Sequence, residues 1–194
     1  MNLQWRMVMA AGSLAILASA PAVFAQSATT PATSSAKAGS TAMGGTKAGA
    51  TASNLDRRFV EAAVAAGMAE VEMGKVAQQR GGADAKRFAN RMVADHDKAN
   101  KELTAIAGTK GMNLPDKLLG GDQRALERLR KLRGAGFDAE YLKSQLAAHK
   151  HAVSLYKRES ANGKDTDLKT FASRTLPTLQ EHLGSITALS KKAR

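Results

Sequence analysis

The sequence predicts an all-α fold in which four helices pack as a bundle. Aromatic residues make up only 4% of the 194-residue chain and there are four prolines, so a β-sheet would lack the residues that favour it. The alanine, leucine, lysine, glutamine and arginine content favours helix instead. After residue 53, apolar residues recur at spacings of three and four, which is the period of an amphipathic helix.

The first two helices are expected on either side of a glycine pair. The first runs from about residue 54 to Arg80, with Ser53 or Asn54 as its cap and "RGG" as its end. The second runs from Asp84 to about Ala107, where "GTKGMNLP" interrupts the pattern. A turn this short would make them an antiparallel hairpin.

The last two helices repeat this arrangement. The third is expected to begin near Phe137 or Asp138 and to end at "ANGKD", and the fourth to begin around Asp165. Pro177 lies inside the fourth helix, and because it removes a backbone donor we expect a kink or a split there. "DAKRFANR" (84–91) matches "DLKTFASR" (167–174) at five positions, so the hairpin is expected to occur twice.

A long connection separates the two predicted hairpins. It contains a short amphipathic segment, "DQRALERLRKLRG", with Leu126, Leu129 and Leu132 on one side. The opposite side carries Arg124, Arg128 and Lys131, which are either simply solvated or bind anionic surfaces. Short, long and short connections together predict a ferritin-like four-helix bundle: two helical hairpins joined by a long crossover that contains a short helix.

The N-terminus predicts export. Residues 1–25 place one basic residue, Arg6, before an apolar run and small residues before Gln26, which is the pattern of a cleaved signal peptide. Residues 26–53 are rich in Ala, Ser, Thr and Gly and predict a flexible linker, leaving residues 54–194 as the bundle domain. We expect a bacterial periplasmic protein, with an uncleaved N-terminal membrane anchor as the alternative.

Four polar residues lie on the apolar stripes of four different helices: Glu70, His96, His149 and His182. Each is near the middle of its helix, so the four can share one centre in the bundle. Imidazoles and a carboxylate would suit Zn, Cu, Fe or Ni. The alternative is a hydrogen-bonded structural cluster in the core, in which Glu70 accepts from the imidazoles.

The residues that precede these histidines differ from the ligand pattern of a ferritin-type di-iron centre. That centre needs glutamate three residues before histidine, and here those positions hold Val93, Leu146 and Leu179. Asp95 and Glu181 directly precede histidines and project about 100° away, so they are candidates for groups that support the ligands, or for surface groups.

Charge and composition exclude other classes of function. The formal net charge is +12, which predicts weak attraction to anionic envelope surfaces. Export and scarce aromatic residues argue against nucleic-acid binding. The chain has no cysteine, hence no thiolate metal site, and it carries no phosphate-binding loop, dinucleotide fingerprint or HExxH motif.

Several longer runs resemble a known family. They are "FVEAAVAAGMAEVEMGKVAQQR", "KRFANRMVADHDKANKEL", "GMNLP", "GAGFDAEYLKSQLAAHKHAV" and "TLPTLQEHL". Together they are similar to the bacterial domain-of-unknown-function 4142 family over about residues 54–190. The family's Gly-x-x-Glu corresponds to Gly67–Glu70, its Asp-His to Asp95–His96, and its Leu-Pro-x-Leu-x-x-His to Leu176–His182.

The resemblance implies a ferritin-like fold and an exported, envelope location, but no established activity. It also places His149 at the family's third-helix histidine, where Ala148 stands in place of a frequent acidic neighbour. We therefore expect, first, a non-enzymatic envelope protein linked to stress whose core cluster binds a transition metal. A structural or interaction module with a basic surface comes second, and a metal-dependent oxidoreductase third. The oligomeric state is not predicted.

Overall fold

The computed structural model describes residues 52–192, which form five helices. They are α1 (Asn54–Arg80), α2 (Ala83–Thr109), α3 (Gly120–Lys131), α4 (Gly134–Asn162) and α5 (Thr166–Lys192). The predicted signal peptide and almost all of the predicted linker lie outside the described residues. Within residues 52–192, no helix is apolar enough over a sufficient length to cross a membrane.

The helix termini follow local capping signals. Ser53 and Asp56 form a capping box at the start of α1, in which each side chain accepts from the other residue's backbone N–H. Asp165 caps α5 by accepting from the backbone N–H groups of Asp167 and Leu168. These signals are local, and the sequence predicted both starts to within one residue.

The third predicted helix was placed too late. It begins at Gly134 rather than at Phe137 or Asp138. Its first three residues, Gly134 to Gly136, are exposed, so no apolar residue marks the first turn. Gly134 has φ 55°, which glycine adopts without strain as the chain leaves α3.

Pro177 does not split α5, contrary to one of the two outcomes expected for it. The helix continues through this position from Thr166 to Lys192. The missing N–H would have bonded the carbonyl of Ser173, one turn earlier. Ser173 and Pro177 are both exposed, so water can satisfy that carbonyl and the interruption is tolerated.

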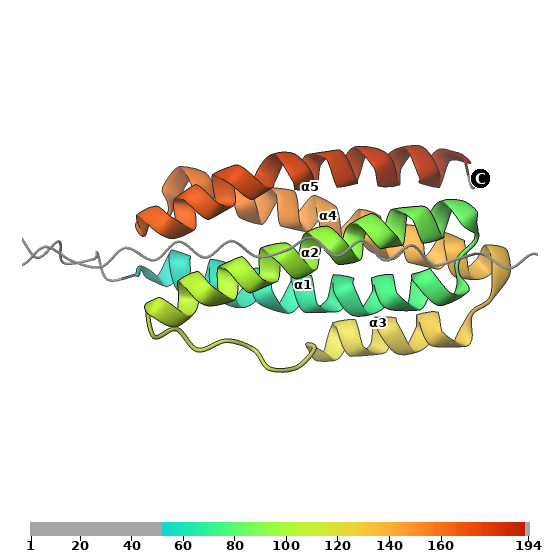
Figure 1. The fold of residues 1–194 in the computed structure, drawn as a ribbon, viewed down its shortest axis with the longest axis horizontal. Coiled ribbons are helices and arrows are strands. Elements are labelled where there is room, and N and C mark those ends of the chain that lie inside the picture. Colours follow the sequence, from blue (N-terminus) through green and yellow to red (C-terminus); the bar gives the residue numbers. More distant parts are fainter. Residues whose placement is uncertain (1–51, 193–194) are drawn as a thin grey trace, which may run out of the picture. The chain divides into compact units, whose positions relative to one another are not determined.

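The helices form two hairpins, α1–α2 and α4–α5, with α1 packed against α4 and α2 against α5 (Figure 1). Gly81 and Gly82 join the first pair, and the Gly82 N–H donates to the carboxylate of Asp138 at the start of α4. At the opposite end, Asp56 accepts from Lys164 and Asp165 after α4. Helices α1 and α4 therefore run antiparallel.

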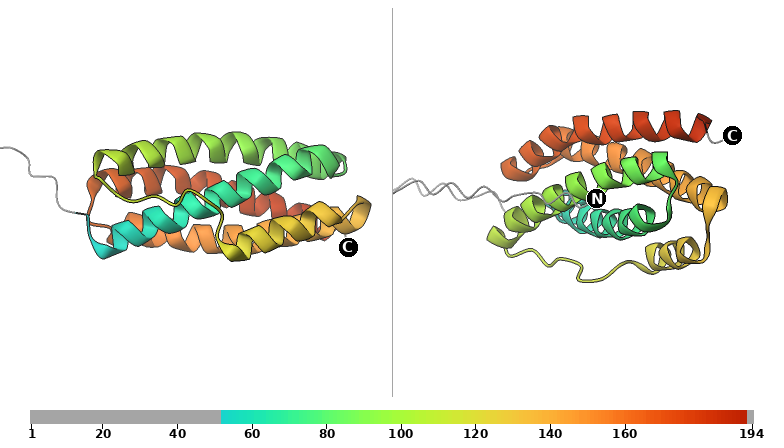
Figure 2. Two further views of the ribbon diagram at one scale, coloured as in Figure 1. Left: turned by 90° about the horizontal axis from the view of Figure 1, so that it is seen from below. Right: turned by 45° about the vertical axis from the view of Figure 1, so that its right-hand side comes forward.

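The long crossover returns the chain to the other end of the bundle. After α2 it runs along the outside of the molecule, and its helix α3 lies beside α1 (Figure 2). Leu126 and Leu129 of α3 are buried, and each contributes on the order of 1.5–3 kcal/mol relative to an exposed position. This arrangement confirms the all-α bundle of two hairpins joined by a crossover with a short helix.

The core consists of two apolar clusters along the bundle. One is built around Phe59, Tyr156 and Phe171. The other includes Phe88 and Phe137. Each of the four long helices carries a buried polar residue at or next to the boundary between the two clusters: Glu70, His96, His149 and His182. These four residues form a polar layer that separates the clusters.

Candidate metal centre

The polar layer contains three imidazoles that face one another. The ring centroids of His96 and His149 are 5.5 Å apart, those of His96 and His182 5.6 Å, and those of His149 and His182 5.5 Å. One nitrogen from each ring lies within 4.8 Å of those from the other two. Metal–nitrogen distances are about 2.0–2.1 Å, so the three rings would have to move closer together to bind a single ion.

The Glu70 carboxylate holds two of the rings. Its Oε2 lies 3.0 Å from Nδ1 of His96, and its Oε1 lies 3.1 Å from Nδ1 of His149. Nδ1 of His149 is also 3.2 Å from the backbone carbonyl of Gln145. Since carboxylate and carbonyl oxygens only accept, both Nδ1 atoms carry a hydrogen, and in the neutral rings each Nε2 keeps a lone pair.

The third ring is held from another helix. Nε2 of His182 donates to Oδ2 of Asp95 at 2.8 Å, so the lone pair of His182 is on Nδ1. Asp95 is also 3.5 Å from Nε of Arg91, which keeps the carboxylate oriented. A carboxylate or carbonyl opposite the free nitrogen is the usual support of a metal-binding histidine.

The three free nitrogens have no partner within the described protein. They are Nε2 of His96, Nε2 of His149 and Nδ1 of His182, and all are buried. The side chains themselves are 7%, 0% and 1% exposed. Buried polar atoms without partners are uncommon because each costs about 1–3 kcal/mol, and three of them on adjacent rings require a common explanation.

Burial and charge act in opposite directions on this cluster. Burial raises the pKa of Glu70, but the contacts with His96 and His149 outweigh it, so the pKa lies well below its usual range. Burial lowers the pKa of His96, while the Glu70 charge raises it to a net value above 6.5. Burial lowers the pKa of His182 to about 4 despite Asp95, so this ring is neutral at neutral pH.

The structure brings the sequence-predicted residues together with different roles. His96, His149 and His182 lie together and each keeps one unpartnered nitrogen. The Glu70 oxygens lie 3.0 and 3.1 Å from two of the rings, and Oε1 makes no well-aligned hydrogen bond. Asp95 accepts a hydrogen bond from the candidate ligand His182. Glu181 does not: it is exposed and pairs with Arg91 at 2.6 Å.

Two core methionines and the basic residues of α3 lie outside the cluster. Met73 and Met92 belong to the apolar cluster on one side of the polar layer. The three basic residues predicted on one side of α3, which are Arg124, Arg128 and Lys131, are exposed. Arg128 lies 3.8 Å from Glu140.

Sequence reasoning missed two polar side chains that lie one and two turns before His149 on α4. Gln145 and Tyr141 are both fully buried, and their side-chain polar atoms have no protein partner. They occur four and eight residues before His149, so the same helical spacing that marked the histidine would have found them. The Tyr141 and Gln145 polar atoms extend the polar layer along the core.

A pocket of ≈ 230 Å³ connects this layer to the surface between α1, α4 and the start of α3. We call it the α1–α4 pocket. Glu70 and His96 line it together with Asp122, which sequence reasoning also passed over, and His151. Burial and the Glu70 charge raise the pKa of Asp122 above its ordinary value.

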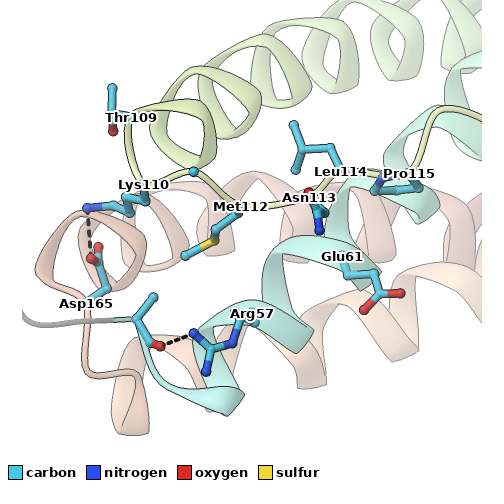
Figure 3. Close-up of a pocket in the computed structure, with 11 residues that line it drawn as sticks. Arg57, Glu61, Thr109, Lys110, Met112, Asn113, Leu114, Pro115 and Asp165 are labelled. Carbon is cyan, nitrogen blue, oxygen red and sulfur yellow. Dashed lines mark hydrogen bonds and ion pairs between the residues drawn. The ribbon is translucent and has the colours of Figure 1, made fainter.

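A second groove, of ≈ 810 Å³, lies at the far end of α1 (Figure 3). The side chain of Lys110 pairs there with Asp165 at 2.8 Å, and Arg57 donates to the carbonyl of Ala52 at 2.6 Å. Its cations are thus already partnered by groups of the chain. The three-histidine cluster is the better candidate for a metal site, because each of its rings keeps a nitrogen without a partner among the described residues.

Comparisons with known proteins agree with this fold. A family model described as "Domain of unknown function (DUF4142)" matches residues 41–189, beginning within the segment predicted as a linker. No curated protein matches the chain.

Two kinds of solved structure share the arrangement. A DUF305 fragment from Deinococcus radiodurans has a TM-score of 0.65 at 11% identity, covering 73% of this chain and 98% of that one. CopM in its Cu(I)-bound form has a TM-score of 0.60 at 14% identity, covering 71% and 96%. The Cu(II)-bound form of CopM has a TM-score of 0.58 at 15% identity, covering 72% of this chain and 97% of that one. At these identities the likeness is one of fold.

Proposed function

The chain belongs to the DUF4142 family of domains of unknown function, and we propose that it binds one copper ion through His96, His149 and His182. The observation that carries the proposal is a group of three buried imidazoles that can bring one nitrogen each within 4.8 Å of the others, and that each keep one nitrogen without a partner. Their opposite nitrogens are held by Glu70, Asp95 and the backbone. The donor set is thereby fixed in the tautomers that leave three lone pairs free.

The chemistry of the donors narrows the choice of metal. Neutral imidazoles suit Cu, Zn, Fe and Ni, and among divalent ions copper is bound most tightly by a given nitrogen site. Two of the solved structures with a similar fold are copper-bound forms of CopM, which supports copper as the first choice. Zinc is the principal competitor, since three histidines also suit it.

A binding role fits these residues better than a catalytic one. The di-iron ligand pattern is absent at Val93, Leu146 and Leu179. The carboxylates in contact with the three rings, Glu70 and Asp95, are those that orient them. The alternative of a purely structural cluster would leave three buried lone pairs unused, which is why we favour the metal.

The experiment is metal analysis of the protein purified without an affinity tag, before and after equilibration with Cu(II) and removal of the excess. We expect about one copper per chain in the native protein, and loss of it in His96→Ala and His149→Ala. Lys150→Ala is the matched control because this residue directly follows His149 on α4 but is exposed and lies outside the pocket, and it should retain copper. A native chain that takes up no copper, or a His96→Ala chain that binds it equally well, would overturn the proposal.

The proposal includes an exported location. Residues 1–25 have the signal-peptide pattern, and a site without cysteine tolerates an oxidising compartment. Cell fractionation and N-terminal sequencing of the mature protein test this: we expect a periplasmic chain that begins at Gln26. A chain retained in the membrane fraction with residues 1–25 intact would support the anchor instead.

The basic side of α3 supports a second, independent proposal. Arg124, Arg128 and Lys131 are exposed on one short helix of a chain with net charge +12, which favours weak binding to anionic envelope surfaces. Co-sedimentation with vesicles containing anionic lipid should fall with added salt, and should fall further in a variant with all three replaced by Gln. Binding that is indifferent to both would exclude this role.

A further inference from the structure

The α1–α4 pocket is lined by one of the three histidines of the cluster. His96 lines its inner end and is 7% exposed, with Nε2 unpartnered. His151 and Leu119 also line the pocket and are exposed, and Asp122 is half-buried. Exposure therefore falls from the surface to the cluster, as it does along an access path.

The charges around the pocket suit a cation. Two carboxylates, Glu70 and Asp122, line it, and its other described lining residues include no lysine or arginine. This is unusual in a chain of net charge +12, whose overall field repels cations. A low-dielectric pocket lined by one sign of charge raises the local concentration of the opposite ion.

The approach from the other side is less suited. Between α2 and α5 lies a groove of ≈ 190 Å³ whose lining balances two cations, Lys98 and Arg174, against two carboxylates, Asp95 and Glu102. Behind it, next to His182, the cavity is only ≈ 20 Å³, about the space of one water molecule. This groove therefore lacks the net negative charge of the α1–α4 pocket, and a hydrated ion would also meet a constriction behind it.

We propose that the α1–α4 pocket is the path by which a copper ion reaches the three histidines, and that Asp122 and His151 bind the ion first. This inference rests on the proposed function and assigns the route to that same site. A carboxylate oxygen and an imidazole nitrogen are both ligands that Cu(II) accepts. They can replace some of its water ligands at the surface before Nε2 of His96 replaces another inside.

The first test measures the rate of loading. Metal-free protein is mixed with Cu(II) in a stopped-flow instrument, and the absorption of the copper–histidine complex is followed. Asp122→Asn and His151→Ala should each slow association, by about tenfold for Asp122→Asn, which is the lower end of what electrostatic focusing supplies. Glu127→Gln removes the same charge from an exposed position of α3 that does not line the pocket, and it should load at the native rate.

The second test blocks the path without changing charge. Ala148 of α4 lines the pocket, and its neighbour Ala147 is exposed and does not. Ala148→Leu should slow both loading and release to a chelator, leaving the final copper content unchanged, whereas Ala147→Leu should do neither. Circular dichroism verifies that the variants are folded. If Ala148→Leu does not fold, the surface change Asp122→Asn still tests the path.

The outcomes separate this inference from the function on which it rests. A native protein that takes up no copper rejects the proposed function. A native protein that loads, with Asp122→Asn, His151→Ala and Ala148→Leu loading equally fast, rejects the path alone. Slower loading in the pocket variants with native rates in Glu127→Gln and Ala147→Leu supports it.

Discussion

Asp95 and His182 join α2 to α5 through a hydrogen bond of 2.8 Å from Nε2 to Oδ2. His182 is 1% exposed, whereas the Asp95 side chain is 37% exposed. The bond therefore runs from the surface of the bundle to its interior. It fixes both the orientation of the imidazole and the nitrogen that carries its hydrogen.

Removing that carboxylate should weaken copper binding. We expect Asp95→Ala to lower the affinity by about 10–100-fold, the usual effect of losing the group that orients a metal-bound histidine. Competition with a chromophoric chelator measures this. Glu181→Ala is the control, because Glu181 also precedes a cluster histidine but pairs with Arg91 at the surface; equal losses in the two variants would contradict a specific role for Asp95.

Copper affinity should fall in acid. In the metal-free protein the Glu70 charge raises the pKa of His96 above 6.5 despite burial, so below that pKa the metal must displace a proton. The apparent affinity should then drop by about tenfold per pH unit. Affinities measured from pH 5 to 8.5 verify this, and a flat profile would contradict it.

Glu70 provides a control for the pH profile. Glu70→Gln removes the negative charge that favours protonated His96, so the pKa of His96 should decrease. The loss of affinity should therefore begin at a lower pH than in the native protein, whatever the affinity at high pH. A profile with an unchanged midpoint would show that another group binds the displaced proton.

The opposite end of the bundle should make stability depend on pH. Burial, with Asp56 and Asp165 nearby, raises the pKa of Glu159 to about 8, and Lys169 only partly offsets this. Between its ordinary value of 4.5 and about 8 the folded protein holds a proton that the unfolded chain has lost. The free energy of unfolding should consequently decrease as the pH rises through that window.

Glu159→Gln should remove this dependence. The amide can donate to Asp56 at every pH, so the variant should be more stable than the native protein at pH 8 by about 3 kcal/mol, and similar in stability near pH 5. Urea denaturation at the two pH values measures the difference. Glu61→Gln, at an exposed position of α1, is the control and should leave the stability unchanged at both pH values. A Glu159→Gln variant that is less stable than the native protein at pH 8 would refute the expectation.

Replacing the proline of α5 should stabilise the protein. Pro177→Ala restores an N–H for the carbonyl of Ser173 and removes a ring that clashes with it. Within a helix, alanine is more favourable than proline by about 3 kcal/mol. The greater entropy of the unfolded chain with alanine reduces this difference, so we expect the free energy of unfolding to increase by about 2 kcal/mol. Thermal unfolding measures it, and a decrease in melting temperature would contradict it.

The boundaries of the helices were predictable where the signal is local. The capping box at Ser53, the glycine pair after Arg80 and the cap at Asp165 each act within a few residues, so they can be recognised in the sequence. The start of α4 was missed because its first turn is exposed and carries no periodic signal. The continuity of α5 through Pro177 depended on which side of that helix faces water.

The sequence by itself determined that Glu70, His96, His149 and His182 lie on buried faces of four helices, because helical period and hydrophobicity are properties of each segment alone. Only the tertiary structure decided how the polar atoms pair. The offset between neighbouring helices directs both Glu70 oxygens at imidazoles, and it brings Asp95 across to His182 on α5 rather than to its own neighbour His96. Which nitrogens remain free, and which pocket reaches them, depends on distances between helices that no spacing along the chain contains.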